Sequence, residues 1–324
     1  MRGMKRRGLM VAALAAPALA RPALAQPAWP NRPIRLVIPF PPGGTTDILA
    51  RFIAPPLGAA LGQPVVIENR SGGAGAVGVV ETLRAAPDGH TICITISTLI
   101  TAALLTRQPY HPVNDVAPIL HLANVANILV VNKTLPVRSV AELIAYGKAN
   151  PGGLAYGSPG IGTSVHLSGE MFKQAAGIEM VHVPYRGGGP ALADLVGGQL
   201  QLMFGNASST LPFVRADQVR ALAVTAATRQ AYAPDLPTIA EAAIPGFEVV
   251  EWYAVIGPAG LPQAVAERLN REILAIVGTP EGRARLLDLG AEIIGGTPAE
   301  FGAFLREDMA RTEALVRSAG IRAE

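Results

Sequence analysis

Short apolar runs alternate with segments of helical spacing along most of this chain. The runs at residues 34–40, 65–68 and 91–96 have the length of buried strands. Residues 46–61 and 76–86, which follow the first two runs, carry apolar side chains three and four positions apart, as amphipathic helices do. This alternation predicts right-handed βαβ units and a mostly parallel sheet.

A second series of the same kind starts at the apolar run 127–132. Its helices are expected at 140–150, 164–175 and 190–196, and its strands at 154–156, 180–183, 200–204 and 219–224. After a strand at 252–256, a proline-containing stretch introduces three amphipathic helices at 263–277, 281–289 and 298–319. The predicted fold class is α/β with two domains and a ligand cleft between them. Domain 1 comprises residues 26–125 plus 245–324, and domain 2, residues 126–244, is inserted into it.

The first apolar run leads into a glycine loop at the start of a helix. Gly43 and Gly44 permit positive φ and close backbone approach, and Thr45, Thr46 and Asp47 are residue types that cap helices. Exposed N–H groups and the positive end of the helix dipole would suit an anionic ligand. Alone, the loop fits an ordinary capped β–α turn equally well.

A second glycine loop changes that balance. It includes Ser158, Gly160, Gly162, Thr163 and Ser164 and lies between an expected strand and an expected helix. Ligands of open α/β sheets bind at the carboxyl ends of strands, so the two loops would form one site across the cleft.

Two further loops follow strands of the second series. Tyr185 and Arg186 precede three glycines, and Arg186 could pair with a carboxylate or lie solvated at the rim. Asn206 is either a hydrogen-bonding site residue or a helix cap. We expect His166 to be a structural histidine that steadies the second loop.

The N-terminus has the pattern of a secretory signal peptide. Residues 2–7 include four basic residues, Arg2, Lys5, Arg6 and Arg7, an apolar run follows, and Ala23-Leu-Ala25 offers a cleavage site after Ala25. The apolar run is too short for a membrane anchor. We therefore predict residues 1–25 to be a cleaved signal peptide, with export by either the general or the twin-arginine route.

Removing this leader changes the charge of the protein. The chain has 27 basic and 24 acidic residues, and five basic residues but no acidic ones lie in the leader. The mature chain is thus slightly acidic, which argues against nucleic-acid binding. The single cysteine, Cys93, lies in an apolar run and is expected to be a buried hydrophobe.

Several other kinds of site are disfavoured. Residues 73–78 match Gly-x-Gly-x-x-Gly, but the next strand ends at Ser97 and Thr98, without the acidic residue that would hold a ribose. The five histidines have neither metal-ligand spacing nor a cysteine partner. We expect no cofactor and no metal.

The motifs taken together resemble those of the Bug family, the periplasmic solute-binding proteins of tripartite tricarboxylate transport systems. The resemblance rests on the leader and on residues 38–51, 66–70, 156–166, 183–189 and 192–199, in the same order. It implies a two-domain, type II periplasmic-binding-protein-like fold that closes on a small carboxylate. It also implies a membrane permease as partner, a periplasmic location and a monomeric, non-enzymatic receptor.

The resemblance also implies which residues bind the ligand. Both glycine loops would hold one carboxylate, and Ser97 and Thr98 match a small polar loop of the first domain. Gly205 stands where many family members carry an acidic residue, which disfavours a ligand with an ammonium group.

Two other functions stay open at this point. One is an exported α/β hydrolase that uses Ser158 with His166, and Ser158→Ala would separate it from a receptor. The other is a ligand-sensing subunit of a signalling system.

Overall fold

The computed structural model describes residues 29–185, 187–318, 320 and 321. Its strands are β1 (Ile34–Ile38), β2 (Val65–Asn69), β3 (Thr91–Ile96), β4 (Val116–Val131), β5 (Ala155–Ser158), β6 (Val181–Pro184), β7 (Leu202–Asn206), β8 (Arg220–Val224), β9 (Val250–Pro258) and β10 (Ala291–Gly295). Its helices are α1 (Thr45–Leu61), η1 (Gly73–Gly75), α2 (Ala76–Leu83), α3 (Thr98–Leu105), α4 (Val140–Ala149), α5 (Ser164–Ala176), α6 (Gly188–Val196), α7 (Ala207–Arg215), α8 (Ile239–Ala242), α9 (Gln263–Val277), α10 (Pro280–Asp288) and α11 (Pro298–Ser318). The predicted signal peptide lies outside these residues, within which no helix is long and apolar enough to cross a membrane.

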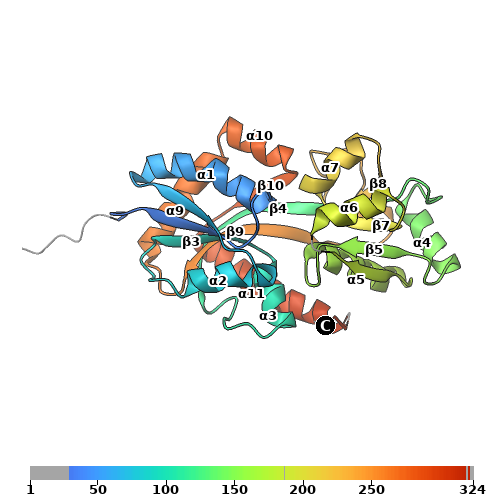
Figure 1. The fold of residues 1–324 in the computed structure, drawn as a ribbon, viewed down its shortest axis with the longest axis horizontal. Coiled ribbons are helices and arrows are strands. Elements are labelled where there is room, and N and C mark those ends of the chain that lie inside the picture. The colour runs from blue at the N-terminus through green and yellow to red at the C-terminus, as the bar shows by residue number, and fades with distance from the viewer. Residues whose placement is uncertain (1–28, 186, 319, 322–324) are drawn as a thin grey trace, which may run out of the picture.

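Strands β4 and β9 run through the middle of the molecule and join two groups of elements (Figure 1). Strand β1 pairs in parallel with β2 and β3, and β5 pairs in parallel with β6 and β7. The first part of β4 pairs with β9 and β10, whereas its end, from Asn127 to Val131, pairs with β7 and β8. We call β1–β3, β9 and β10 with α1–α3 and α9–α11 the first lobe, and β5–β8 with α4–α8 the second lobe. The predicted domain boundaries stay a prediction.

The α/β class is confirmed, but the prediction of a mostly parallel sheet is wrong. Strands β4, β8, β9 and β10 form antiparallel pairs: β9 and β4 occupy the centre of the sheet order, and β8 and β10 pair with β4 beside it. The run expected at 127–132 is the end of a strand that begins at Val116. Pro118 and His121 interrupt its apolar pattern, and the pairing with β9 shifts register at both places. Such bulges absorb residues that break strand alternation.

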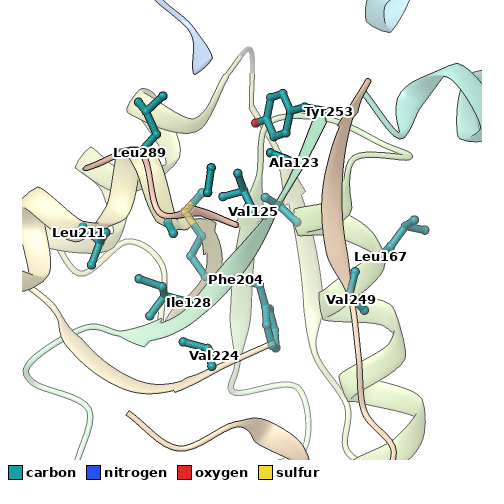
Figure 2. Packing of buried hydrophobic residues seen from close by; sticks show 14 of the residues in the cluster. Ala123, Val125, Ile128, Leu167, Phe204, Leu211, Val224, Val249, Tyr253 and Leu289 are labelled. Carbon is teal, nitrogen blue, oxygen red and sulfur yellow. The ribbon is translucent and has the colours of Figure 1, made fainter. Parts of the chain in front are cut away.

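A continuous apolar core fills both lobes. One cluster of buried side chains extends from Ile34 in the first lobe through Val125 and Ile128 of β4 to Phe204 in the second. Figure 2 shows this cluster along β4, with Tyr253 beside its cross-strand partner Ala123 and Phe204 further along. The core therefore fixes the path of β4 and β9 between the lobes.

A second cluster lies between the sheet and α11. It contains Cys93, Trp252, Phe301 and Leu305, all buried. Burial raises the pKa of the Cys93 thiol to about 12, so the thiol is unreactive at neutral pH. The prediction that Cys93 is a small buried hydrophobe is confirmed.

Candidate functional site

The first glycine loop carries β1 into α1, and Asp47 holds it in shape. The Asp47 carboxylate accepts hydrogen bonds from the Gly43 N–H at 3.0 Å, from Arg51 Nε at 2.8 Å and from Asn69 Nδ2 at 3.1 Å. The Arg51 hydrogen bond, with those from Gly43 and Asn69, lowers the pKa of Asp47 to about 2 against the effect of burial. Asp47 therefore stays ionised, and its negative charge is balanced by the Arg51 guanidinium.

The helix cap differs from the expected one. Helix α1 begins at Thr45, and its N-cap is Gly44, which has no side chain to cap the first turn. The prediction that Thr45, Thr46 or Asp47 caps the helix is therefore wrong, because the chain enters the helix one residue earlier. N–H groups of an uncapped first turn need acceptors from elsewhere. Thr45 is half-buried and Thr46 buried, while Gly43 and Gly44 are exposed.

The second glycine loop is folded on itself at the start of α5. The carbonyl oxygen of Gly160 accepts from Thr163 Oγ1 at 2.8 Å and from Ser158 Oγ at 3.1 Å. Thr163 is the N-cap of α5, and its hydroxyl accepts from the His166 N–H at 3.4 Å. The Gly162 N–H donates to His166 Nδ1 at 3.2 Å. His166 is thus a loop-bracing histidine, as expected.

Ser158 pairs with a different histidine from the one that the hydrolase alternative requires. Its hydroxyl lies 2.7 Å from His182 Nε2, and the Ser158 side chain is fully buried. Burial lowers the pKa of His166, whose ring lies against that of His182 at a centroid distance of 4.2 Å and an interplanar angle of 35°. The side chains of Ser158, His166 and His182 therefore make their contacts within the second lobe.

The two lobes touch directly at the glycine loops. Thr45 Oγ1, at the start of α1, lies 2.8 Å from Ser208 Oγ at the start of α7. Gly162 of the second loop lies against α3 of the first lobe, where an added Cβ would come within 2.8 Å of Leu105 Cδ1 and 3.5 Å of Thr101 Oγ1. The structure thus brings both predicted loops to one seam between the lobes.

Strand β9 supplies two polar side chains that bind both lobes at this seam. The buried Glu251 carboxyl accepts hydrogen bonds from Ser97 Oγ of the first lobe and, at 2.7 Å, from Ser164 Oγ of the second. Two positions further along β9, the Tyr253 hydroxyl contacts the side chains of Thr45 and Asn206. Residues i and i+2 of a strand share a face. We call Glu251 and Tyr253 the β9 pair.

The β9 pair was missed by sequence reasoning. The one available signal is that both residues are polar within the apolar run 249–256. Burial raises the pKa of the Glu251 carboxyl, and nearby Asp308 adds to that rise. Burial also raises the pKa of Tyr253. A buried carboxyl with two hydroxyl partners is a feature that active and binding sites share with structural networks.

The remaining predicted site residues make contacts within their own lobes, in addition to the contact of Asn206 with Tyr253. The hydroxyl of Tyr185 donates to Asp194 Oδ2 of α6 at 2.7 Å. Asn206 is the N-cap of α7, accepting from Ser208, as its capping alternative states. Thr98 is buried at the start of α3, and Arg186 lies outside the described residues.

Gly205 has a steric role in this chain. A Cβ at this position would lie 2.2 Å from Thr210 Oγ1, so the Thr210 side chain occupies the space that a larger residue 205 would need. Across residues 29–185, 187–318, 320 and 321, no group of three His, Cys, Asp or Glu side chains could hold a metal ion.

Comparisons with known proteins match this architecture over nearly the whole chain. The model of the tripartite tricarboxylate transporter family receptor matches residues 49–321. Among solved structures, Rpa4515 from R. palustris with adipate is 40% identical, with a TM-score of 0.83, covering 91% of this chain and 99% of that one. The periplasmic binding protein BugD is 33% identical, with a TM-score of 0.80 and coverages of 91% and 100%. MatC from Rhodopseudomonas palustris with bound malate is 31% identical, with a TM-score of 0.79 and coverages of 89% and 100%.

Proposed function

The chain belongs to the tripartite tricarboxylate transporter receptor family, and from that premise we propose that it captures a small organic carboxylate between its two lobes. We further propose that it delivers this ligand to the membrane permease of a tripartite tricarboxylate-type transporter. Structures of the similar proteins Rpa4515 and MatC hold adipate and malate, which supports a carboxylate as ligand.

The observation that carries this proposal is the uncapped start of α1 at the seam between the lobes, where the second glycine loop also lies. Gly44 leaves first-turn N–H groups of α1 without a side-chain acceptor, while Gly162 brings the second loop to the same seam. Helix N-termini bind carboxylates through such N–H groups and through the helix dipole. The sole charged residue of the first loop, Asp47, is neutralised by Arg51, so it does not oppose an anion.

The remaining residues of the predicted site have different proposed roles. Gly43, Gly44, Gly160 and Gly162 would let the backbone approach the ligand. Thr45, Ser97, Ser164 and Asn206 would act mainly by holding the lobes together, because their side chains bond across the seam or to the β9 pair.

The proposal places the protein in the periplasm as a monomeric receptor without catalytic activity. Residues 1–25 would be its cleaved signal peptide. The solved relative BugD is a periplasmic binding protein, which supports this location. The buried Ser158 hydroxyl, bonded to His182, supports a structural rather than a nucleophilic role.

A valine at Gly44 tests the proposal with little risk to folding. Gly44 has φ −77 and ψ 169, which valine adopts, and its added Cβ would meet only the Pro41 carbonyl, at 3.9 Å. We expect Gly44→Val to unfold like the wild type and to lose carboxylate binding, because the side chain would cover the first-turn N–H groups. Ala60→Val, at the exposed far end of α1, is the matched control. Unchanged affinity in Gly44→Val would refute an anion site at this helix start.

A further inference from the structure

A cavity of about 370 Å³ lies beside the second glycine loop. Its walls come from η1, from α3 and from Ile161 of the second loop, so both lobes contribute to it. Ala74, Ala102, Leu105 and Ile161 give it an apolar lining. Such a cavity, next to a proposed anion site, can receive the remainder of a ligand whose carboxylate is held by the loops.

Thr101 is the inner polar group of this cavity. Its side chain is 2% exposed, and its hydroxyl has no hydrogen-bond partner within the described residues. The hydroxyl faces the second loop, since a Cβ on Gly162 would lie 3.5 Å from Thr101 Oγ1. A buried hydroxyl without a partner is costly. A ligand oxygen next to the carboxylate would supply that partner.

The polarity of the cavity changes along α3. Thr101 lies at its buried end, Ala102 and Leu105 follow, and Thr106 is exposed. Gln108, beyond them, donates to Thr106 Oγ1 at 2.6 Å. None of the described residues that line the cavity carries a charge. A second ionised group on the ligand would therefore be desolvated beside apolar walls without an opposite charge.

We propose that this cavity is the specificity pocket and that Thr101 is its specificity-determining residue. The ligand class it fits is a hydroxy- or oxo-carboxylate whose oxygen substituent lies next to the carboxylate and whose tail is uncharged and apolar. This inference rests on the proposed function, because the glycine loops must hold the carboxylate end.

Three acids of equal chain length test the proposal by calorimetric titration: hexanoate, 2-hydroxyhexanoate and adipate. We expect 2-hydroxyhexanoate to bind about five- to tenfold more tightly than hexanoate, the effect of one net hydrogen bond. Adipate should bind more weakly than either. If adipate binds more tightly than the other two acids, the proposal that the ligand tail is uncharged is wrong, but the proposed function still stands.

The isosteric variant Thr101→Val isolates the hydroxyl. We expect it to bind 2-hydroxyhexanoate and hexanoate with equal affinity, while hexanoate binds as it does to the wild type. Thr95→Val is the matched control, because Thr95 is also buried with an unpartnered hydroxyl but does not line the cavity. An equal loss for both ligands in Thr101→Val, or no loss for either, would overturn the role of Thr101.

A charge introduced at the mouth provides an independent test. Gln108→Arg places a guanidinium beside the ligand tail, and we expect adipate affinity to rise about tenfold relative to hexanoate. Gln263→Arg on α9, exposed and remote from the cavity, is the control. If the ratio of adipate affinity to hexanoate affinity does not change in Gln108→Arg, the proposal that the ligand tail lies beside residue 108 is wrong. Wild-type protein that binds none of these acids would refute the pocket, and absence of binding to every carboxylate would refute the proposed function as well.

Discussion

Replacing Glu251 by glutamine should remove a pH dependence of stability that is built into the seam between the lobes. The Glu251 carboxyl is buried and accepts from hydroxyls of both lobes, Ser97 and Ser164. Burial is the main cause that raises its pKa above the ordinary 4.5, and the carboxyl of Asp308 raises it further. Glutamine keeps the shape and one acceptor oxygen but cannot ionise.

The sign of the effect follows from proton linkage. Because the folded-state pKa of Glu251 is raised, the protonated carboxyl is favoured in the native protein. Its contribution to stability is complete below pH 4.5 and is lost as the pH rises toward the folded-state pKa. Within that window the free energy of unfolding of the wild type should fall, relative to Glu251→Gln, by up to about 1.4 kcal/mol per pH unit.

Urea unfolding of both proteins between pH 4 and pH 8, without ligand, measures this difference. Every other titrating group is shared, so subtracting the two curves isolates Glu251. We expect the difference to grow from pH 4.5 upward in favour of the variant and then to level off. Parallel curves would show that Glu251 titrates as an ordinary carboxyl, and the account of the β9 pair would be wrong.

Three further substitutions test the loops and their surroundings. Asp47→Asn should lower the free energy of unfolding by about 2 kcal/mol at neutral pH, because charged hydrogen bonds are lost. This loss should shrink below pH 4 as the wild-type carboxylate titrates toward its pKa of about 2. Equal destabilisation at all pH values in urea unfolding would contradict this prediction. Gly162→Ala should both destabilise the protein and weaken carboxylate binding, since φ is +81° and the Cβ would meet an α3 side chain at 2.8 Å. Gly177→Ala is the control, because it has φ +62° and open space and should only destabilise the protein. Equal carboxylate affinity in the two variants would contradict the placement of Gly162 at the seam between the lobes. Gly205→Ser should lower the melting temperature, and adding Thr210→Ala should restore much of the loss, because the Thr210 side chain occupies the space that a serine at position 205 needs. If the changes in melting temperature of the two single variants simply add in the double variant, the two residues do not compete for space.

The glycine loops could be predicted from sequence because their determinants are local. A strand, a pair of glycines and a helical period lie within about a dozen residues, and the loops at Gly43 and Gly162 occupy the predicted strand–helix junctions. Helix α9 was likewise predicted to its end residues, Gln263–Val277, since its apolar stripe has one clear period.

The features that escaped prediction depend on distant partners. Glu251 bonds Ser97, 154 residues away, and Ser164, 87 residues away, and no local pattern carries that pairing. Helix α3 is apolar on nearly all sides, so its sequence shows no periodicity to identify it. Strand β4 is interrupted by Pro118 and His121, and only tertiary pairing with β9 tolerates the resulting bulges.

Calorimetric titration of the mature protein, residues 26–324, with small organic acids and their primary amides tests the central claim most directly. If helix N-termini hold an ionised carboxylate, one class of acid should bind with 1:1 stoichiometry, and the matching amide, which lacks the charge, should bind at least tenfold more weakly. Equal affinity for an acid and its amide, or no binding by any acid, would contradict the proposal that this protein is a carboxylate receptor.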